Sequence, residues 1–263
     1  MSNLSPSDAV DAPPVGTEEH NLLASVEAIS VSDNHWEMGL KFFPEGDVHP
    51  VLAEILDVGA AKSTPSSGSG ESSYIPFLIE LAVKRPLGWT EAEVEAIALR
   101  ALEQTQSSLI EDLLAAGSVS GSQYLADANL TLIGSDAAVP EVALARLETA
   151  IAAQGGHATI YMSPGVATIL GSAYLYEVGD KLYTLRGDLV VVGNLGNQGP
   201  GATTATTDQS YIYAHIGEPV LRLGSVQVYS AIDHTINERV VRVERTVSVV
   251  FVPNQWITLA KYI

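Results

Sequence analysis

Apolar residues recur at spacings of three and four between residues 94 and 114, which places them on one stripe of a helix. Thr90 and Glu93 form a T-x-x-E capping box at the start, and Gly117 is a typical helix stop. The pattern predicts a helix over residues 90–116, roughly 37 Å long at about 1.5 Å per residue. Its stripe comprises Val94, Ile97, Ala98, Ala101, Leu102, Thr105, Leu109, Ile110, Leu113 and Leu114.

A second helix is predicted over residues 140–154. Pro140 suits a first helical turn, and Gly155 and Gly156 follow the end of the pattern. The apolar face of this helix is formed by Val142, Leu144, Leu147 and Ile151.

Strands are predicted where branched and aromatic residues cluster or alternate. They cover residues 73–85, 158–162 and 188–194, and residues 163–172 read as a turn into a short helix. Near the C-terminus apolar and polar positions alternate, which predicts a strand with one dry face. The dry positions are Val241, Val243, Val247, Val249 and Phe251, and the wet ones are Arg242, Glu244, Thr246 and Ser248. The irregular order of strands and helices predicts an α+β fold.

Two segments without a periodic pattern are predicted to be loops. Residues 62–73, KSTPSSGSGESS, contain no apolar residue, although apolar runs flank them on both sides. Residues 194–209 are rich in Gly, Thr and Asn and follow a predicted buried strand. Both segments are typical of extended surface loops.

The charge balance disfavours sequence-specific DNA binding. The net charge is −18, and the first 60 residues hold eleven acidic residues against Lys41 alone. Such a surface repels phosphate, and it lacks the basic stripe of a protein that grips nucleic acid. The acidic N-terminal segment has two interpretations: a solvated arm that aids solubility, or an arm that lies over basic residues of a neighbouring subunit.

No segment predicts a membrane span, a cofactor site or a metal site. Apolar runs fall short of the ~18 residues that a span needs, and the start of the chain lacks the features of a signal peptide, which favours a cytoplasm. The absence of cysteine excludes disulfides and thiolate chemistry, and the six histidines have no metal-ligand spacing. Residues 193–199 fit neither phosphate-loop pattern.

Three short motifs that resemble functional signatures have simpler interpretations. Ser163 lacks the flanking glycines of a nucleophile elbow, and the adjacent pair Asp233 and His234 defines no catalytic triad. The tripeptide Arg186-Gly187-Asp188 spells an adhesion motif, but between two apolar segments it predicts a turn joining two strands. No catalytic residue is therefore assigned, and the sequence does not predict an enzyme.

Three ordered segments resemble the major capsid proteins of tailed phages, particularly those that infect actinobacteria. Residues 74–117 are similar to that family's strand, turn and long helix. Residues 139–170 and 182–201 are similar to its central domain, including a pattern L-Y-T-x2-G before a glycine-rich loop. Residues 211–253 resemble its returning strands. The resemblance spans about residues 60–255.

The resemblance implies the α+β Hong Kong 97-like fold and its division into parts. Residues 1–50 would be the N-terminal arm and 51–89 the extended-loop region. Residues 90–134 would be the peripheral domain with its spine helix, 135–222 the axial domain, and 223–263 the C-terminal strands of the peripheral domain.

The resemblance also assigns the two polar loops. The extended loop would lie across a neighbouring subunit through Lys62, Ser63, Thr64, Pro65, Gly68, Gly70 and Glu71. The axial loop, near the centre of each capsomer, would contain Asn194, Gly196, Asn197, Gly199 and Gly201. Some family members crosslink subunits through a lysine of the extended loop, for which Lys62 is the candidate, but non-covalent locking is the expectation.

The implied function is structural. The chain would assemble with itself into hexamers and pentamers of an icosahedral head, in the cytoplasm of a host bacterium, and would contact packaged double-stranded DNA non-specifically. A scaffolding protein, a portal and a decoration protein are the expected partners, and the virion is the expected location. The alternatives are an encapsulin-type nanocompartment shell and, more remotely, a cytosolic α+β enzyme.

Overall fold

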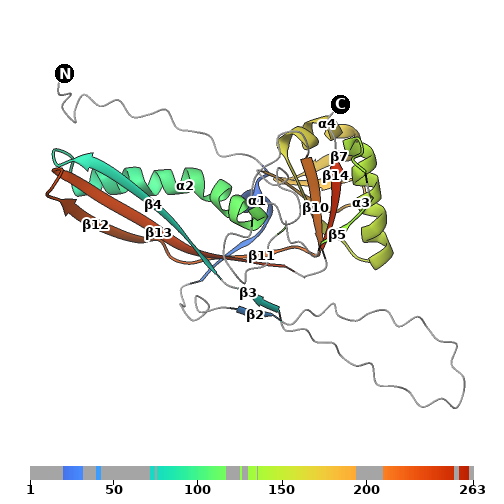
Figure 1. Ribbon diagram of the computed structural model, residues 1–263, viewed down its shortest axis with the longest axis horizontal. Coiled ribbons are helices and arrows are strands. Elements are labelled where there is room, and N and C mark those ends of the chain that lie inside the picture. Colours follow the sequence, from blue (N-terminus) through green and yellow to red (C-terminus); the bar gives the residue numbers. More distant parts are fainter. Residues whose placement is uncertain are drawn as a thin grey trace, which may run out of the picture.

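The structure is a computed structural model that describes residues 20–31, 40–42, 72–74, 76–116, 125, 130–134, 136–193, 210–251 and 255–260. The molecule is elongated (Figure 1). A long helix on a narrow sheet forms one half, and a wider sheet flanked by two helices forms the other. Helices and strands mix irregularly along the chain, as the α+β prediction requires.

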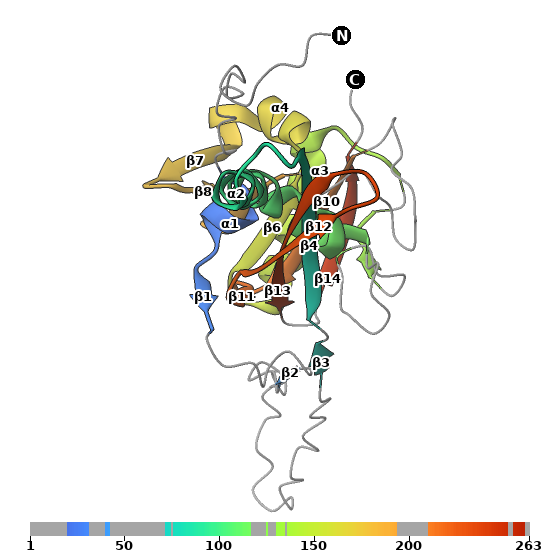
Figure 2. The same ribbon diagram turned by 90° about the vertical axis from the view of Figure 1, so that its left-hand side faces the viewer.

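The narrow half is a five-stranded sheet centred on its longest strand. Its elements are β1 (Ala28–Ser30), β4 (Phe77–Pro86), β11 (Val220–Leu223), β12 (Gln227–Asp233), β13 (Glu238–Val250) and the covering helix α2 (Glu91–Ala116). Strand β13 pairs antiparallel with β4 along one edge and with β12 and β11 along the other, while β1 adds parallel to β11. Helix α2 lies along one face of this sheet (Figure 2).

Helix α2 begins at the predicted capping box. The backbone N–H of Glu93 donates to Thr90 Oγ1 at 3.3 Å, and the N–H of Thr90 donates to Glu93 Oε2 at 2.8 Å. The hydrogen bonds from Thr90 to the Glu93 side chain lower the pKa of that carboxyl. The prediction of a helix over residues 90–116 is confirmed.

The contact between α2 and β13 is a seam of apolar side chains with one polar pair in its middle. One row of buried residues on α2 is spaced by four, at Val94, Ala98, Leu102, Ile110 and Leu114. The facing row on β13 contains Val241, Val243, Val247 and Val249. Each row is interrupted at one position by a polar residue, which is Gln106 on α2 and Arg245 on β13. Arg245 Nη1 donates to Gln106 Oε1 at 2.9 Å, and its Nε donates to the carbonyl of Gly224 at 2.9 Å. The predicted dry positions Val241, Val243, Val247 and Val249 are buried, and the same face also holds this arginine. The prediction of an exposed Ser248 is wrong, because residues 247–250 are all buried where β13 approaches the second half of the molecule.

The wide half is a seven-stranded mixed sheet with both faces covered. Its elements are β5 (Thr131–Leu132), α3 (Pro140–Gln154), β6 (Ala158–Met162), α4 (Pro164–Tyr174), β7 (Leu175–Val178), β8 (Lys181–Thr184), β9 (Leu189–Val192), β10 (Ser210–Ile216) and β14 (Gln255–Ala260). The strand order is β5-β14-β10-β6-β9-β8-β7. One face packs on the core beneath α2, and the other packs against α3 and α4. All five residues of β6 are buried because they alternate between these two cores.

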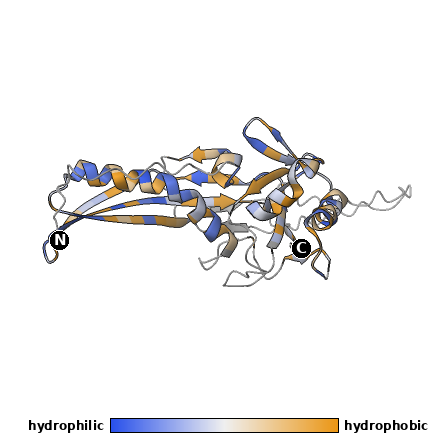
Figure 3. Cartoon of the chain, turned by 90° about the horizontal axis from the view of Figure 1, so that it is seen from above, coloured by the Kyte–Doolittle hydropathy of each residue, from blue (hydrophilic) through white to orange (hydrophobic). Residues whose placement is uncertain are grey.

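Three shorter elements complete the described chain. Helix α1 (Leu22–Ser25) packs against α2 and β9, and a two-stranded ribbon is formed by β2 (Leu40–Phe42) and β3 (Ser72–Tyr74). In Figure 3, polar and apolar residues interleave along the long helix and the long strands. This interleaving is the pattern from which those elements were predicted.

The strand pairing corrects two details predicted from the sequence. Residues 255–260 were grouped with the peripheral strands, but β14 lies inside the seven-stranded sheet, where Ile257 and Thr258 are buried. Residues 220–222 were assigned to the axial domain, but they belong to β11, which lies in the five-stranded sheet. Both differences arise because strand partners are set by contacts distant in sequence.

Two local predictions also need correction. The strand predicted over residues 73–85 is two strands, β3 and β4, separated at Pro76, which has no N–H to donate to a ladder. Val142 was placed on the apolar face of α3, but its side chain is exposed and Ala143 takes the buried position. The remaining predicted face of α3 is buried.

We expect Gln106→Ala to lower the free energy of unfolding by about 1 to 3 kcal/mol, because Arg245 then keeps its place in the seam without one acceptor. Urea denaturation would measure the difference. Gln104→Ala is the matched control, since Gln104 makes the same change in helix propensity two positions away, off the seam. Equal losses in both variants would contradict the role of the polar pair.

Candidate functional site

The residues predicted for the two loops lie outside the described residues. They are Lys62, Ser63, Thr64, Pro65, Gly68, Gly70 and Glu71 of the extended loop and Asn194, Gly196, Asn197, Gly199 and Gly201 of the axial loop. The structure does describe the stems from which both segments leave the fold. Those stems, together with the start of the arm, form the candidate functional site.

The extended loop leaves from the β2–β3 ribbon. The strands are antiparallel, and Phe42 pairs with Ser72 at the point where residues 43–71 begin and end. The two ends of this segment are therefore held side by side by backbone hydrogen bonding. A hairpin stem of this kind fixes where the segment starts without fixing its tip.

The arm is anchored to its own subunit through residues 20–31. Asn21 caps α1 by accepting the N–H of Ala24 at 2.8 Å, and Leu22 is fully buried beneath α2. The carbonyl of His20 accepts the N–H of Val192 at 2.9 Å, which ties the arm to the end of β9. Strand β1 then extends the five-stranded sheet.

One buried carboxylate lies between helix α1 and Gly193, the residue that follows β9. Glu111 of α2 is 1% exposed, and its Oε1 accepts the N–H of Leu22 at 3.0 Å. Gly193, the last described residue before the axial loop, lies so close that a Cβ there would be 2.3 Å from Glu111 Oε2. Sequence analysis missed Glu111, because nothing in its neighbourhood distinguishes it from the exposed glutamates of the same helix.

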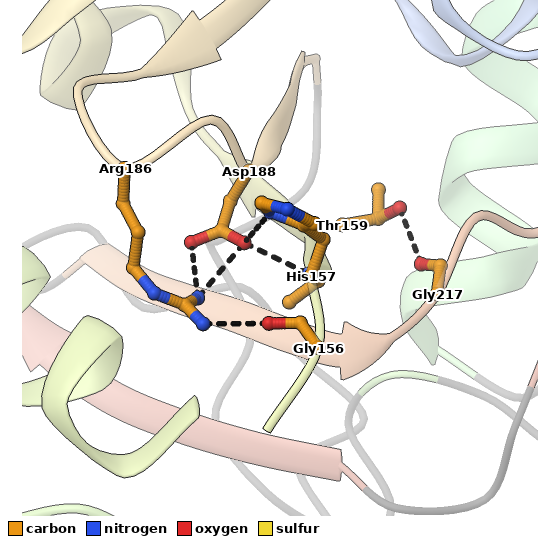
Figure 4. Close-up of polar contacts among 7 residues, drawn as sticks. Gly156, His157, Thr159, Arg186, Asp188 and Gly217 are labelled. Carbon is orange, nitrogen blue, oxygen red and sulfur yellow. Dashed lines mark hydrogen bonds and ion pairs between the residues drawn. The ribbon is translucent and has the colours of Figure 1, made fainter. Parts of the chain in front are cut away.

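The Arg186-Gly187-Asp188 tripeptide forms the predicted turn between β8 and β9 (Figure 4). Gly187 has a φ of +92°, which favours glycine, and its N–H donates to the carbonyl of Thr184 at 2.8 Å. Asp188 is fully buried. A receptor for an adhesion motif needs this carboxylate at the surface, so the interpretation as a turn is the correct one.

Asp188 holds the turn against the start of β6. Its two oxygens accept from Arg186 Nη1 at 2.9 and 2.7 Å, and Oδ1 accepts the N–H of Ala158 at 2.9 Å. Arg186 Nη2 also donates to the carbonyl of Gly156, and His157 Nδ1 lies 3.5 Å from Asp188 Oδ1. Figure 4 shows that the contacts of Asp188 hold the turn to the start of β6, and it also shows a separate hydrogen bond from Thr159 Oγ1 to the carbonyl of Gly217.

A buried histidine joins the two halves of the molecule. His215 of β10 stacks on Phe251, which follows β13, and its Nε2 accepts from the hydroxyl of Tyr161 at 2.8 Å. Nδ1 lies 3.1 Å from the carbonyl of Ile216, which can only accept, so Nδ1 carries the proton of a neutral ring. Burial lowers the pKa of His215 to about 4.

Other kinds of site find little support in the described part of the chain. Among the described residues, no three His, Asp or Glu side chains gather closely enough to hold a metal ion. No helix within the described ranges combines the length and the apolar character needed to span a membrane. Ser163 caps α4, where its Oγ accepts the N–H of Val166 at 3.4 Å.

Comparison with known proteins finds relatives by structure alone. The sequence matches no family model and no curated protein. The capsid of an empty GTA particle superposes with a TM-score of 0.59 at 12% identity, over 96% of this chain and 95% of that one. A structure from Mycobacterium phage Ogopogo gives 0.57 at 10% identity, over 99% of both chains. The SrpI encapsulin of Synechococcus elongatus gives 0.56 at 11% identity, over 95% of this chain and 91% of that one. The chain therefore has the predicted Hong Kong 97-like fold.

We expect Gly193→Ala to lower the free energy of unfolding by about 1 to 3 kcal/mol, because the new methyl group must displace the Glu111 carboxylate. The same change made in a Glu111→Ala chain meets no carboxylate and should cost at least about 1 kcal/mol less. Chemical denaturation of the wild type, the two single variants and the double variant measures the coupling free energy between the two positions. Additive effects would show that the close approach carries no energy.

We expect the stability to fall on acidification through His215. The unfolded histidine binds a proton near pH 6.5, whereas the pKa of His215 in the folded state is about 4, so the unfolded state gains protons first as the pH drops. Between pH 7 and pH 5 this contributes about 2 kcal/mol of lost stability. Urea titrations should show that His215→Gln removes this part of the loss and that His234→Gln, in an exposed turn, retains it. Equal losses of stability in the wild type, His215→Gln and His234→Gln would contradict the assignment of this loss to His215.

Proposed function

We propose, from the Hong Kong 97-like fold, that this chain is the major capsid protein of a tailed phage. It self-assembles into hexamers and pentamers that close an icosahedral head around double-stranded DNA. The supporting observation is coverage: a phage structure matches 99% of this chain by 99% of its own, and Gordonia phage Cozz gives 99% and 90%. The proposal assigns the chain no catalysis.

The extended loop, in this proposal, makes contacts between subunits. Residues 43–71 leave from a hairpin stem, and residues 62–71 within them have too little apolar surface to form a core of their own. We assign Lys62, Ser63, Thr64, Pro65, Gly68, Gly70 and Glu71 to a tip that lies across a neighbouring subunit. The contact is non-covalent, with Lys62 as the one candidate for a crosslink.

The axial loop is assigned to the centre of each capsomer. Its ends are held at Gly193, after β9, and at Ser210, the first residue of β10, and these two strands flank β6. The two described ends of the loop therefore belong to central strands of the seven-stranded sheet. We place Asn194, Gly196, Asn197, Gly199 and Gly201 in this central contact.

The remaining assignments concern location and partners. A net charge of −18 suits a shell that encloses DNA without adhering to it, because adhesion would hinder packaging and ejection. The protein would be assembled in the cytoplasm of a host bacterium and would reside in the virion. A separate scaffolding protein, a portal and a decoration protein complete the expected set of partners.

An encapsulin shell is the second candidate, because the encapsulin match has a TM-score within the range of the phage matches. The two functions differ in what the shell encloses. A phage head contains DNA, whereas a nanocompartment contains protein cargo.

We expect purified protein, alone or with a scaffolding protein, to form closed shells or capsomer rings in negative-stain electron microscopy and to elute far above its mass of 27.8 kDa. Nuclease-protected DNA in shells from infected cells would identify a phage head, and co-purifying protein cargo an encapsulin. Denaturing gels should show a single band at the chain mass, and higher bands lost in Lys62→Arg would reveal a crosslink. A persistent monomer at high concentration would overturn the proposal.

A further inference from the structure

Strand β12 is an edge strand that the described chain leaves open. Along one side it pairs with β13 from Gln227 to Asp233, and none of the described residues pairs with its other side. Every residue of β12 except Asp233 is exposed. The exposed fractions of its large hydrophobic side chains are 37% for Val228, 47% for Tyr229 and 41% for Ile232. An exposed seven-residue edge with three large hydrophobic side chains is a template for another strand.

The opposite edge of the same sheet is built differently. Strand β4 also pairs with β13 alone among the described strands, but it carries Glu80, Lys84, Arg85 and Pro86. Charged residues and proline are the means by which proteins prevent strands from adding to an edge. In β12 the single charge stands at the end, at Asp233. One long edge is therefore protected, and the other is available.

We propose that β12 pairs antiparallel with β12 of a second copy of this chain, about a two-fold axis through Ser230. The inference rests on the proposed function, since so small a contact needs copies held together by other surfaces. Two-fold contacts use the same patch on both copies, so the strand must be complementary to itself.

The sequence of β12 is complementary to itself in one register. With Ser230 opposite its own copy, Val228 faces Ile232 and the bulky Tyr229 faces the small Ala231. At the ends Gln227 faces Asp233, so no two carboxylates are opposed. Moving the axis by one residue places Val228 or Ile232 opposite Ser230 and loses the apolar pair. Cross-strand pairs of this kind are the units that stabilise sheets.

The same register keeps the two copies in one orientation. Val228 and Ser230 pair with Val243 and Val241 of β13, so they lie on the face that α2 covers. Residues directly opposite each other share a face in an antiparallel pair. The two five-stranded sheets then form one continuous sheet with both α2 helices on the same side. Tyr229 stays on the other face, where Arg242 lies 5.1 Å from its ring.

A single cysteine at the axis tests this register, because the chain has no cysteine of its own. In Ser230→Cys, the two thiols would lie on directly opposed residues about 4.5 to 5.5 Å apart at Cα, within the range for a disulfide. In Ala231→Cys, the control, they would be diagonal neighbours roughly 7 to 8 Å apart, which is too far. After assembly and mild oxidation, we expect roughly fivefold more disulfide dimer from Ser230→Cys on a non-reducing gel.

A mixed assembly provides a second test that does not depend on Ser230. Chains with Val228→Cys and chains with Ile232→Cys should form dimers when assembled together and few when assembled alone, because these positions face each other only across the axis. Shells in which Ser230→Cys crosslinks no more than Ala231→Cys, and the mixture no more than its parts, would overturn the pairing and leave the proposed function standing. A chain that stays monomeric and uncrosslinked would contradict both.

Discussion

The structure depends on the register between α2 and β13. Buried residues repeat every four positions along the helix and every two along the strand, so the two repeats advance by nearly equal lengths. Sliding one element past the other would bring Arg245 against an aliphatic side chain and Gln106 against a valine. The pair of Gln106 and Arg245 thus specifies the register of a contact that is stabilised mainly by apolar burial.

The position of β13 determines where most of the other elements lie. The same strand pairs with β4, β11 and β12, and Phe251 beyond its end stacks on His215 of the seven-stranded sheet. The core beneath α2 continues into that sheet through Tyr161, Leu189 and Tyr213. Glu111, further along the same helix, reaches the arm and the start of the axial loop. The described stems of the segments proposed to meet other subunits are therefore attached to the same packed unit.

Much of this could be predicted from the sequence, and the failures have a common cause. Periodicity and capping located α2 and α3, and alternation located β13, because these signals are local. The partner of Arg245 is 139 residues away, and the partners of β14 lie in β10 and β5, so no local pattern encodes them. Glu111 is identified only by contacts with Leu22 and Gly193. The fold class was within reach of the sequence, whereas strand order and the buried charges were not.

Because β13 lies near the end of the chain, the five-stranded sheet can form only late in synthesis. Strand β4 leaves the ribosome about 150 residues before the strand that pairs with it, a wait on the order of ten to thirty seconds at bacterial elongation rates. The interval between the synthesis of β1 and that of its partner β11 is longer still. During this time the sheet against which α2 packs is incomplete. A chain that stops before residue 238 lacks β13 and therefore cannot form the five-stranded sheet. Nearly all of the chain must be synthesised before β4, β11 and β12 have their common partner.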